Sequence, residues 1–185
     1  MKRLLSVALL LFAAHTALSG QAIPTPAATP LQPPVPAAAP SADSSKPIFT
    51  GTWKLNVTKS EFGQVPPPSS ETDIFTQTGN DLKIATTSDG QRGKEVYTIP
   101  FTIGGEESLT PKDTFPSAAE FKILSTKGEW QDTTLIVDQK MTYQGSPGTV
   151  HSTFTLSPDG KTITRATHYS LDLGEFDTRT FYDKQ

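Results

Sequence analysis

Apolar and polar residues alternate with a period of two from residue 47 to residue 185, and this pattern constrains the fold more than any other feature. Such alternation is typical of β-strands that bury one face, and no segment shows the 3.6-residue period of an amphipathic helix. Turn-forming residues interrupt the pattern about every 8 to 12 positions. The sequence Pro-Asp-Gly-Lys at 158–161, for example, predicts a tight hairpin. We therefore predict an all-β domain of about eight or nine antiparallel strands in up-and-down order.

A sheet of this size buries one face either as a closed barrel or as two sheets packed in a sandwich. Closure removes the exposed edges through which sheets aggregate, so we predict a single barrel over residues 47–185. A barrel of about eight strands is wide enough either to be filled by side chains or to hold one small ligand. The sequence leaves both kinds of interior open.

The first 46 residues predict two segments that precede the domain. Residues 1–22 have the order of a secretory signal peptide, with two basic residues, an apolar run over 4–14 and small residues suited to cleavage. The run is shorter than the ~20 apolar residues that span a bilayer, so we expect a secreted or periplasmic protein without a membrane span after cleavage. Residues 23–46 are rich in proline and alanine and lack aromatic residues. They are expected to form a disordered linker, because they bury too little apolar surface to offset the entropy of ordering.

Composition excludes several classes of function. The chain has no cysteine, which rules out disulfides, thiolate metal sites and cysteine nucleophiles, and its net charge of −3 argues against nucleic-acid binding. His151 and His168 are the only histidines of the predicted domain, and neither has a His-x-His or Glu-x-x-His spacing. Their parity places them on the solvent face of neighbouring strands, where they can pair across the ladder. We predict a monomeric non-enzyme with no catalytic residue, metal site or cofactor.

The two ends of the predicted domain carry a family resemblance. Gly51 and Trp53, within the string FTGTWKL of residues 49–55, resemble the first-strand signature of the calycin superfamily, which includes lipocalins and fatty-acid-binding proteins. Residues 178–184 are similar to the closing strand of fatty-acid-binding proteins, and the hairpin SPDGKT is similar to that of small exported bacterial lipocalin-like proteins. The resemblance implies that Trp53 closes one barrel end with Arg179 stacked across its ring, and that Gly51 lets the backbone bend.

Arg165 shares the parity of the apolar residues of its strand and is expected to face the barrel interior. An arginine in an apolar interior needs a partner anion, and the acidic residues nearest in sequence lie in turns. A bound anionic amphiphile such as a fatty acid would supply the counter-charge and an apolar tail; the alternative is a rim position with the guanidinium in water. The candidate ligand-binding residues are Arg165, Tyr143, Gln139, Tyr169, Phe154 and Met141.

The sequence therefore predicts an exported, non-enzymatic barrel that binds a small apolar or amphipathic ligand, with an anionic lipid or fatty acid as one class. The alternative is a packed-interior barrel that serves as a periplasmic or surface interaction module without a small-molecule ligand. Fatty-acid-binding proteins carry a helical lid after the first strand. The three prolines at 66–68 do not fit inside a helix, so any lid in this chain is expected to be a loop.

Overall fold

The structure, a computed structural model, describes residues 46–91 and 93–185. The predicted signal peptide and all but the last residue of the predicted linker lie outside the described residues. The described part forms ten strands and one short 3-10 helix. These elements are β1 (Gly51–Leu55), η1 (Val57–Lys59), β2 (Ser70–Thr78), β3 (Asp81–Gly90), β4 (Gly93–Thr102), β5 (Ser108–Leu109), β6 (Phe121–Gln131), β7 (Thr134–Tyr143), β8 (Ser146–Leu156), β9 (Thr162–Leu171) and β10 (Gly174–Lys184). No helix in this part of the chain has the length and apolar character needed to cross a membrane.

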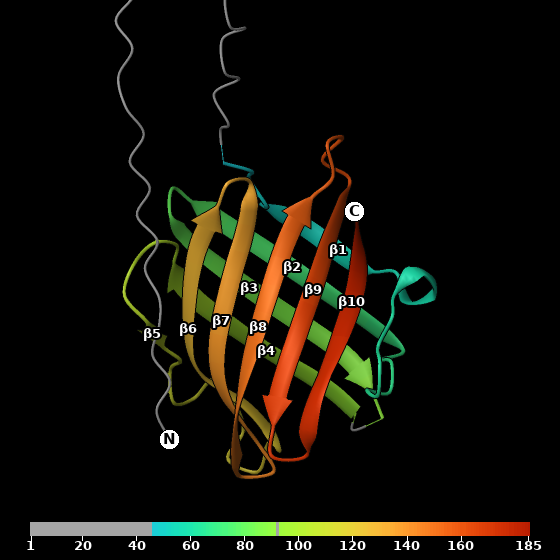
Figure 1. Ribbon diagram of the computed structural model, residues 1–185, viewed down its shortest axis with the longest axis vertical. Helices are drawn as coiled ribbons and strands as arrows, with labels where there is room; N and C mark the ends of the chain where they lie inside the picture. The colour runs from blue at the N-terminus through green and yellow to red at the C-terminus, as the bar shows by residue number, and fades with distance from the viewer. Residues whose placement is uncertain (1–45, 92) are drawn as a thin grey trace, which may run out of the picture. The chain divides into compact units, whose positions relative to one another are not determined.

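All ten strands belong to one antiparallel sheet, in the spatial order β4-β3-β2-β1-β10-β9-β8-β7-β6-β5. β1 pairs with both β2 and β10, so the first strand joins the last, as Figure 1 shows. The predicted all-β, up-and-down architecture is confirmed, whereas the predicted count of eight or nine strands is too low. The strand that the alternation does not reveal is β5, because its two residues are too few to show a period.

The two ends of this sheet meet near Gly128. Ile103, just after β4, forms a bridge with Gly128 of β6, and the amide of Gly104 donates to the Gly128 carbonyl at 2.7 Å. A Cβ on Gly128 would lie 2.5 Å from Cε2 of Phe101, so glycine is what lets this ring approach the strand. The sheet therefore closes nearly completely into a barrel.

β1 is short and pairs with only the last part of β10. The loop between β1 and β2 continues this pairing along β10. Beyond Leu55, the amide of Glu61 donates to the Arg179 carbonyl at 2.7 Å, and the amide of Arg179 donates back at 2.8 Å. Gly63 has φ +57°, and a Cβ there would lie 2.5 Å from the Asp177 carbonyl oxygen. The loop therefore lies directly against β10. As predicted, it is irregular apart from the three-residue η1.

The buried core gathers at one end of the barrel, where β1 begins and β10 ends; we call this the closed end. Its members come mainly from strand positions near that end: Phe49, Trp53, Leu55, Phe75, Leu82, Ile99, Phe101, Ile103, Leu135, Phe154, Ile163 and Tyr182. Trp53 is fully buried, and its indole Nε1 donates to the Phe49 carbonyl at 2.8 Å. The Phe49 ring in turn stacks on Trp130, with ring centroids 5.9 Å apart. These contacts fill the closed end with aromatic side chains.

The predicted stacking of Arg179 on Trp53 is wrong. Trp53 lies opposite Lys184 in the β1–β10 ladder, and the Lys184 ammonium sits 5.2 Å from the centre of the indole ring. Arg179 has the opposite parity to Lys184, so it is exposed on the outer face, where its guanidinium lies 5.6 Å from the Phe181 ring. Gly51 does allow a close approach, as expected. It has φ +146°, and a Cβ there would lie 3.1 Å from Cε of Lys184.

Lys46, the last residue of the predicted linker, already contacts the barrel. Its ammonium donates to the Asp132 carbonyl at 2.7 Å and lies 5.9 Å from the centre of the Trp130 ring. The contact is exposed to solvent, where cation–π pairs contribute roughly 0.5–1 kcal/mol. Lys46 is therefore joined to the closed end through Asp132 and Trp130.

The closed end yields a double-mutant test. Trp53→Ala is expected to lower the free energy of unfolding by about 3–5 kcal/mol, because a fully buried indole is removed. Lys184→Ala should cost less than about 1 kcal/mol and should couple to Trp53→Ala by roughly 0.5 kcal/mol or more. Arg179→Ala, the matched control, should be additive with Trp53→Ala. Urea unfolding of the five variants measures these energies, and coupling to Arg179 in place of Lys184 would contradict the assignment.

Candidate functional site

The end of the barrel opposite the core is less completely filled; we call it the mouth. It is framed by the β3–β4, β7–β8 and β9–β10 turns and by the loop over residues 56–69. The aromatic side chains gathered here are only partly buried: Tyr97, Phe115, Phe121, Tyr143, Tyr169 and Phe176. At the closed end, Phe49, Trp53 and Phe154 are at most 5% exposed, while Trp130 is partly buried. The barrel interior is therefore packed at one end and accessible at the other.

Five of these six mouth aromatics form two groups. Tyr97, Phe115 and Phe121 make one, with ring centroids 5.1 Å apart for Tyr97 and Phe115 and 6.0 Å apart for Phe115 and Phe121. Tyr169 and Phe176, on the paired strands β9 and β10, make the other, with rings stacked at 4.7 Å and an interplanar angle of 16°. Aromatic faces of this kind provide apolar contact area for a small molecule.

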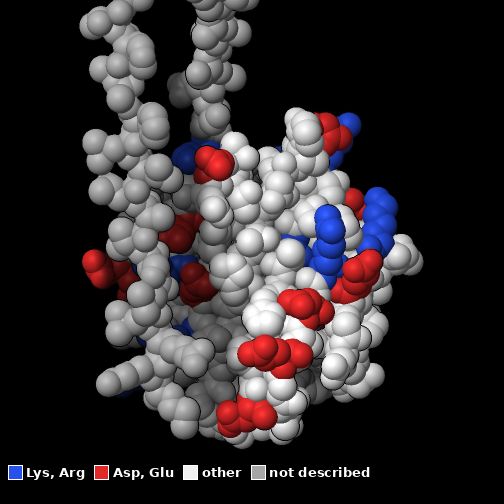
Figure 2. Space-filling view, in the orientation of Figure 1, with Lys and Arg blue, Asp and Glu red and all other residues white. Residues whose placement is uncertain are grey.

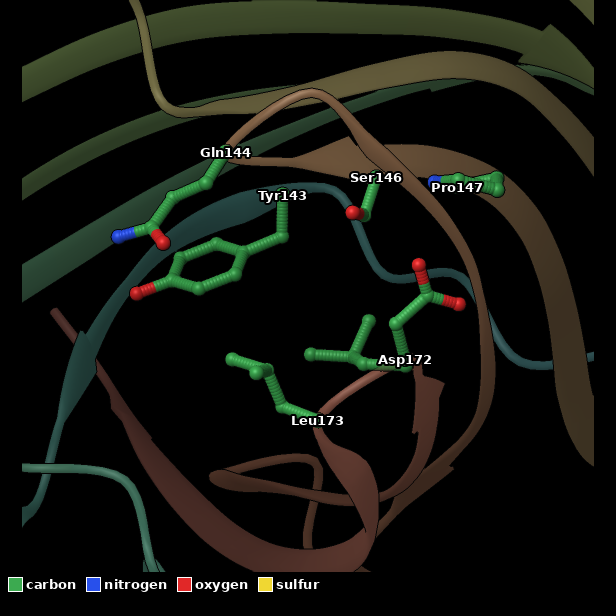
Figure 3. A pocket seen from close by; sticks show the side chains of 7 residues that line it. Tyr143, Gln144, Ser146, Pro147, Asp172 and Leu173 are labelled. Atoms are coloured by element: carbon green, nitrogen blue, oxygen red, sulfur yellow. The ribbon is translucent and has the colours of Figure 1, made fainter.

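A small pocket opens at the mouth between the β7–β8 and β9–β10 turns. Its volume is about 100 Å³, and it is lined by Tyr143, Gln144, Ser146, Pro147, Leu171, Asp172 and Leu173. Figure 3 shows the Tyr143 ring and the Leu173 side chain directed into this space from the two turns. Ligand sites for drug-sized molecules occupy roughly 300 Å³ or more. A ligand of that size would therefore have to extend from this pocket among the mouth aromatics.

A charged cluster lies inside the barrel, between β9 and β2. Arg165 of β9 donates from Nη2 to Oε1 of Glu71 at 3.3 Å, and its Nη1 lies 3.8 Å from Oδ2 of Asp73. The Tyr182 hydroxyl donates to the same Glu71 oxygen at 2.5 Å, and the guanidinium lies 5.0 Å from the centre of the Tyr182 ring. We call Arg165, Glu71, Asp73 and Tyr182 the charged cluster.

Asp73 is the most deeply buried member of the charged cluster. Thr86 donates to its Oδ1 at 2.7 Å. Burial raises the pKa of Asp73 to about 7, and the negative charge of Glu71 acts in the same direction, while Arg165 and the Thr86 hydrogen bond oppose the shift. At neutral pH the charge of the cluster therefore depends on whether Asp73 holds a proton.

Solvent reaches part of the charged cluster. The side chains of Arg165 and Glu71 are 23% and 14% exposed, whereas that of Asp73 is 2% exposed. Glu71 is the second residue of β2 and lies at the mouth end of that strand, so we infer that solvent enters from the mouth. Nε of Arg165 is buried and has no hydrogen-bond partner among the described residues. The cluster therefore forms a polar floor below the mouth aromatics.

The structure brings together some of the predicted ligand-binding residues and separates others. Arg165 faces the interior as predicted, and Tyr143 and Tyr169 lie at the mouth with Met141, which is buried. Gln139 does not join the charged cluster. Its side-chain amide instead donates a hydrogen bond to Oγ1 of Thr126 at 3.1 Å. Phe154 lies opposite Arg165 in the β8–β9 ladder, but its ring packs into the core with its centroid 6.0 Å from that of Phe75.

The partners of Arg165 were not predicted from the sequence. A partner anion for Arg165 was expected, and the structure supplies it as two carboxylates of the chain, Glu71 and Asp73, which reach it from β2. These two carboxylates share the parity of Phe75 within β2, and that alternation was the signal that could have revealed them. Which strand they would meet across the barrel was not contained in the pattern.

Comparisons with known proteins give a fold likeness and nothing more specific. No family model matches the chain, and no curated protein matches it. Among solved structures, zebrafish ileal bile acid-binding protein complexed with cholic acid is 15% identical with a TM-score of 0.47, covering 74% of this chain and 98% of its own. The Schistosoma mansoni fatty-acid-binding protein in complex with arachidonic acid is 15% identical, with a TM-score of 0.44. That match covers 74% of this chain and 96% of the Schistosoma chain. Secretory abundant heat soluble protein 4 from Ramazzottius varieornatus is 13% identical, with a TM-score of 0.44. That match covers 74% of this chain and 94% of the Ramazzottius chain.

The buried carboxylate predicts a pH dependence of stability. Asp73 has a pKa of about 7 in the folded protein and an ordinary value of 3.8, so between these pH values the folded state holds a proton that the unfolded chain releases. Its contribution to stability is complete below about pH 4 and is lost as the pH rises through about 7. Urea unfolding at pH 4, 6 and 8 should show the wild type losing stability relative to Asp73→Asn. Parallel profiles for the two proteins would contradict the assignment.

Proposed function

We propose that this chain is an exported, monomeric, non-enzymatic barrel that binds a small amphipathic molecule at its mouth. The apolar part of the ligand would lie between the mouth aromatics, and its polar group would meet the charged cluster. The observation that carries the proposal is the contrast between the two barrel ends. Phe49, Trp53 and Phe154 are buried at the closed end, whereas the six mouth aromatics all keep accessible surface above a polar floor.

Export is supported by the sequence of residues 1–22, which has the basic, apolar and small-residue order of a signal peptide. A protein without cysteine gains no disulfide in an oxidising compartment, so the barrel must be stabilised by its core and hydrogen bonds. The packed closed end and the ladder pairing of β1 with β10 provide that stability.

The charges at the floor favour a neutral or cationic polar group over an anionic one. Arg165 lies next to two carboxylates, so the cluster holds one positive charge against one or two negative charges, depending on the proton of Asp73. A fatty-acid carboxylate would add a further negative charge beside Glu71 and would compete with it for the guanidinium. We therefore favour a neutral hydrogen-bonding amphiphile, such as a fatty alcohol or a monoacylglycerol, over a free fatty acid.

A barrel with a packed interior and no ligand is the second candidate. The filled closed end and the small volume of the pocket, about 100 Å³, favour it. The two candidates differ in whether a molecule with an acyl tail enters the mouth.

Titration with three fluorescent probes that share one acyl tail and carry a neutral, a cationic or an anionic head group tests the proposal. We expect saturable binding, with the anionic probe the weakest of the three. Leu173→Ser should weaken binding about fivefold, because Leu173 lines the pocket and loses apolar contact of roughly 1 kcal/mol. Leu173 is 79% exposed, so its replacement should leave stability unchanged.

Ile74→Ser is the matched control, since Ile74 is also an exposed aliphatic residue, on the outer face of β2. It should leave the affinity of all three probes unchanged. Absence of saturable binding for every probe would favour the packed-interior candidate. An equal loss of affinity in the two variants would argue that the probes bind non-specifically to exposed apolar surface.

A further inference from the structure

Four residues form a continuous row across the outer face of β7, β8, β9 and β10, which lie side by side in Figure 1. The ladder places Asp138 opposite His151, His151 opposite His168, and His168 opposite Asp177. The order Asp-His-His-Asp is therefore symmetric about the β8–β9 pair. Figure 2 shows that acidic side chains are exposed on this face of the barrel.

Each histidine is held by the aspartate next to it. Nδ1 of His151 lies 2.7 Å from Oδ1 of Asp138, and Nδ1 of His168 lies 2.9 Å from Oδ1 of Asp177. A carboxylate accepts hydrogen bonds, so Nδ1 of each ring is the donor and Nε2 of the neutral imidazole carries a free lone pair. This is the arrangement that orients a histidine for metal binding, because the carboxylate fixes the tautomer and the direction of the ring.

The two hydrogen bonds point in opposite directions along the row, one toward β7 and the other toward β10. The Nε2 edges of the two rings are therefore turned toward the centre of the row and the solvent above it. Side chains directly opposite on paired strands have Cβ atoms roughly 5 Å apart. Two imidazole nitrogens bound to one metal ion at 2.0–2.1 Å each lie about 3 Å apart, which neighbouring histidines of this kind can reach by side-chain rotation.

We propose that His151 and His168 together bind a divalent transition-metal ion on the outer face of the barrel, through their two Nε2 atoms. Imidazole ligands suit Cu²⁺, Ni²⁺ and Zn²⁺, and Cu²⁺ binds most tightly in the general order of affinities. In the part of the chain that the structure describes, no group of three or more His, Cys, Asp or Glu side chains is placed to hold a metal. Water therefore completes the coordination, and Asp138 and Asp177 act as positioning residues.

The surroundings do not oppose a cation at this place. Lys140, two residues beyond Asp138 on β7, is engaged by Glu107, with its Nζ 2.9 Å from the carboxylate. Arg179, two residues beyond Asp177 on β10, lies over the Phe181 ring. The His151 and His168 side chains are 51% and 44% exposed, so an ion reaches them directly from solvent. The site is independent of the mouth, because outer-face and inner-face residues alternate along β8 and β9.

Calorimetric titration of the full chain with Cu²⁺ tests the proposal. We expect one ion per chain, at least tenfold weaker binding in His151→Ala or His168→Ala, and loss of this binding step in the double variant. Asp138→Asn should weaken binding by less than either histidine substitution, because the ring keeps its Nε2 but loses a charged partner. Thr153→Ala, on the same outer face of β8, is the matched control and should bind like the wild type.

Electron paramagnetic resonance of the Cu²⁺-loaded wild type should show superhyperfine splitting from two equivalent nitrogens. In the NMR spectrum of the wild type, Cu²⁺ should broaden amide signals around residues 151 and 168 first. No saturable Cu²⁺ binding, or unchanged binding in the double variant, would overturn the proposal. Broadening that begins elsewhere in the chain would overturn it as well, whether or not the variants fold.

Discussion

The positive charge of Arg165 lies inside the barrel and has to be neutralised there. The polar side chains of the interior are placed to meet this requirement. The side chain starts on the inner face of β9, and its partners Glu71 and Asp73 start on β2, with β10 and β1 between the two strands in the sheet. The ion pairs therefore cross the interior and tie together parts of the wall that no ladder hydrogen bond connects. The Tyr182 hydroxyl and the Thr86 hydroxyl complete the set by donating to the two carboxylates. Such mutual pairing offsets the cost of burying charge, although Nε of Arg165 is buried without a hydrogen-bond partner among the described residues.

This network also separates the two ends of the barrel. Apolar side chains fill the closed end, where Trp53 and Phe49 exclude solvent completely. On the mouth side of the network the walls are aromatic but incompletely covered, and a guanidinium that keeps 23% of its side-chain surface accessible can exist only beside water or a polar ligand. The interior is thus neither a uniformly packed core nor an open apolar cavity. Along the barrel, the apolar closed end is followed by the charged cluster and then by the partly exposed aromatic side chains of the mouth.

Alternation in the sequence was sufficient to predict which residues of β7, β8 and β9 face inward, including Arg165, and it also placed His151 and His168 outside. It failed where geometry depends on pairing between distant strands. Arg179 was matched to Trp53 by resemblance, whereas the β1–β10 register brings Lys184 there. The role of Glu71 was missed because its partner is 94 residues away in sequence, across the barrel. Alternation also does not reveal the register shift between Ile123 and Ser125, which changes the parity within β6.

The inner charged cluster and the outer histidine row depend on one shared feature, the register of β8 against β9. A slip of one residue would turn the side chains of a strand to the other face, taking Arg165 away from Glu71 and His168 away from His151. The turn between these strands fixes that register. Ser157 donates its hydroxyl to Asp159 at 2.6 Å, accepts from the amide of Thr162 at 2.9 Å, and donates its own amide to the Thr162 carbonyl at 2.8 Å. Side-chain and backbone hydrogen bonds from Ser157 and Lys161 lower the pKa of the Asp159 carboxyl, so the charged form that accepts them is favoured. The turn over residues 157–162, which the sequence predicts, therefore fixes the register at one end of the β8–β9 pair. That register decides that Arg165 faces the interior and that His151 and His168 face solvent.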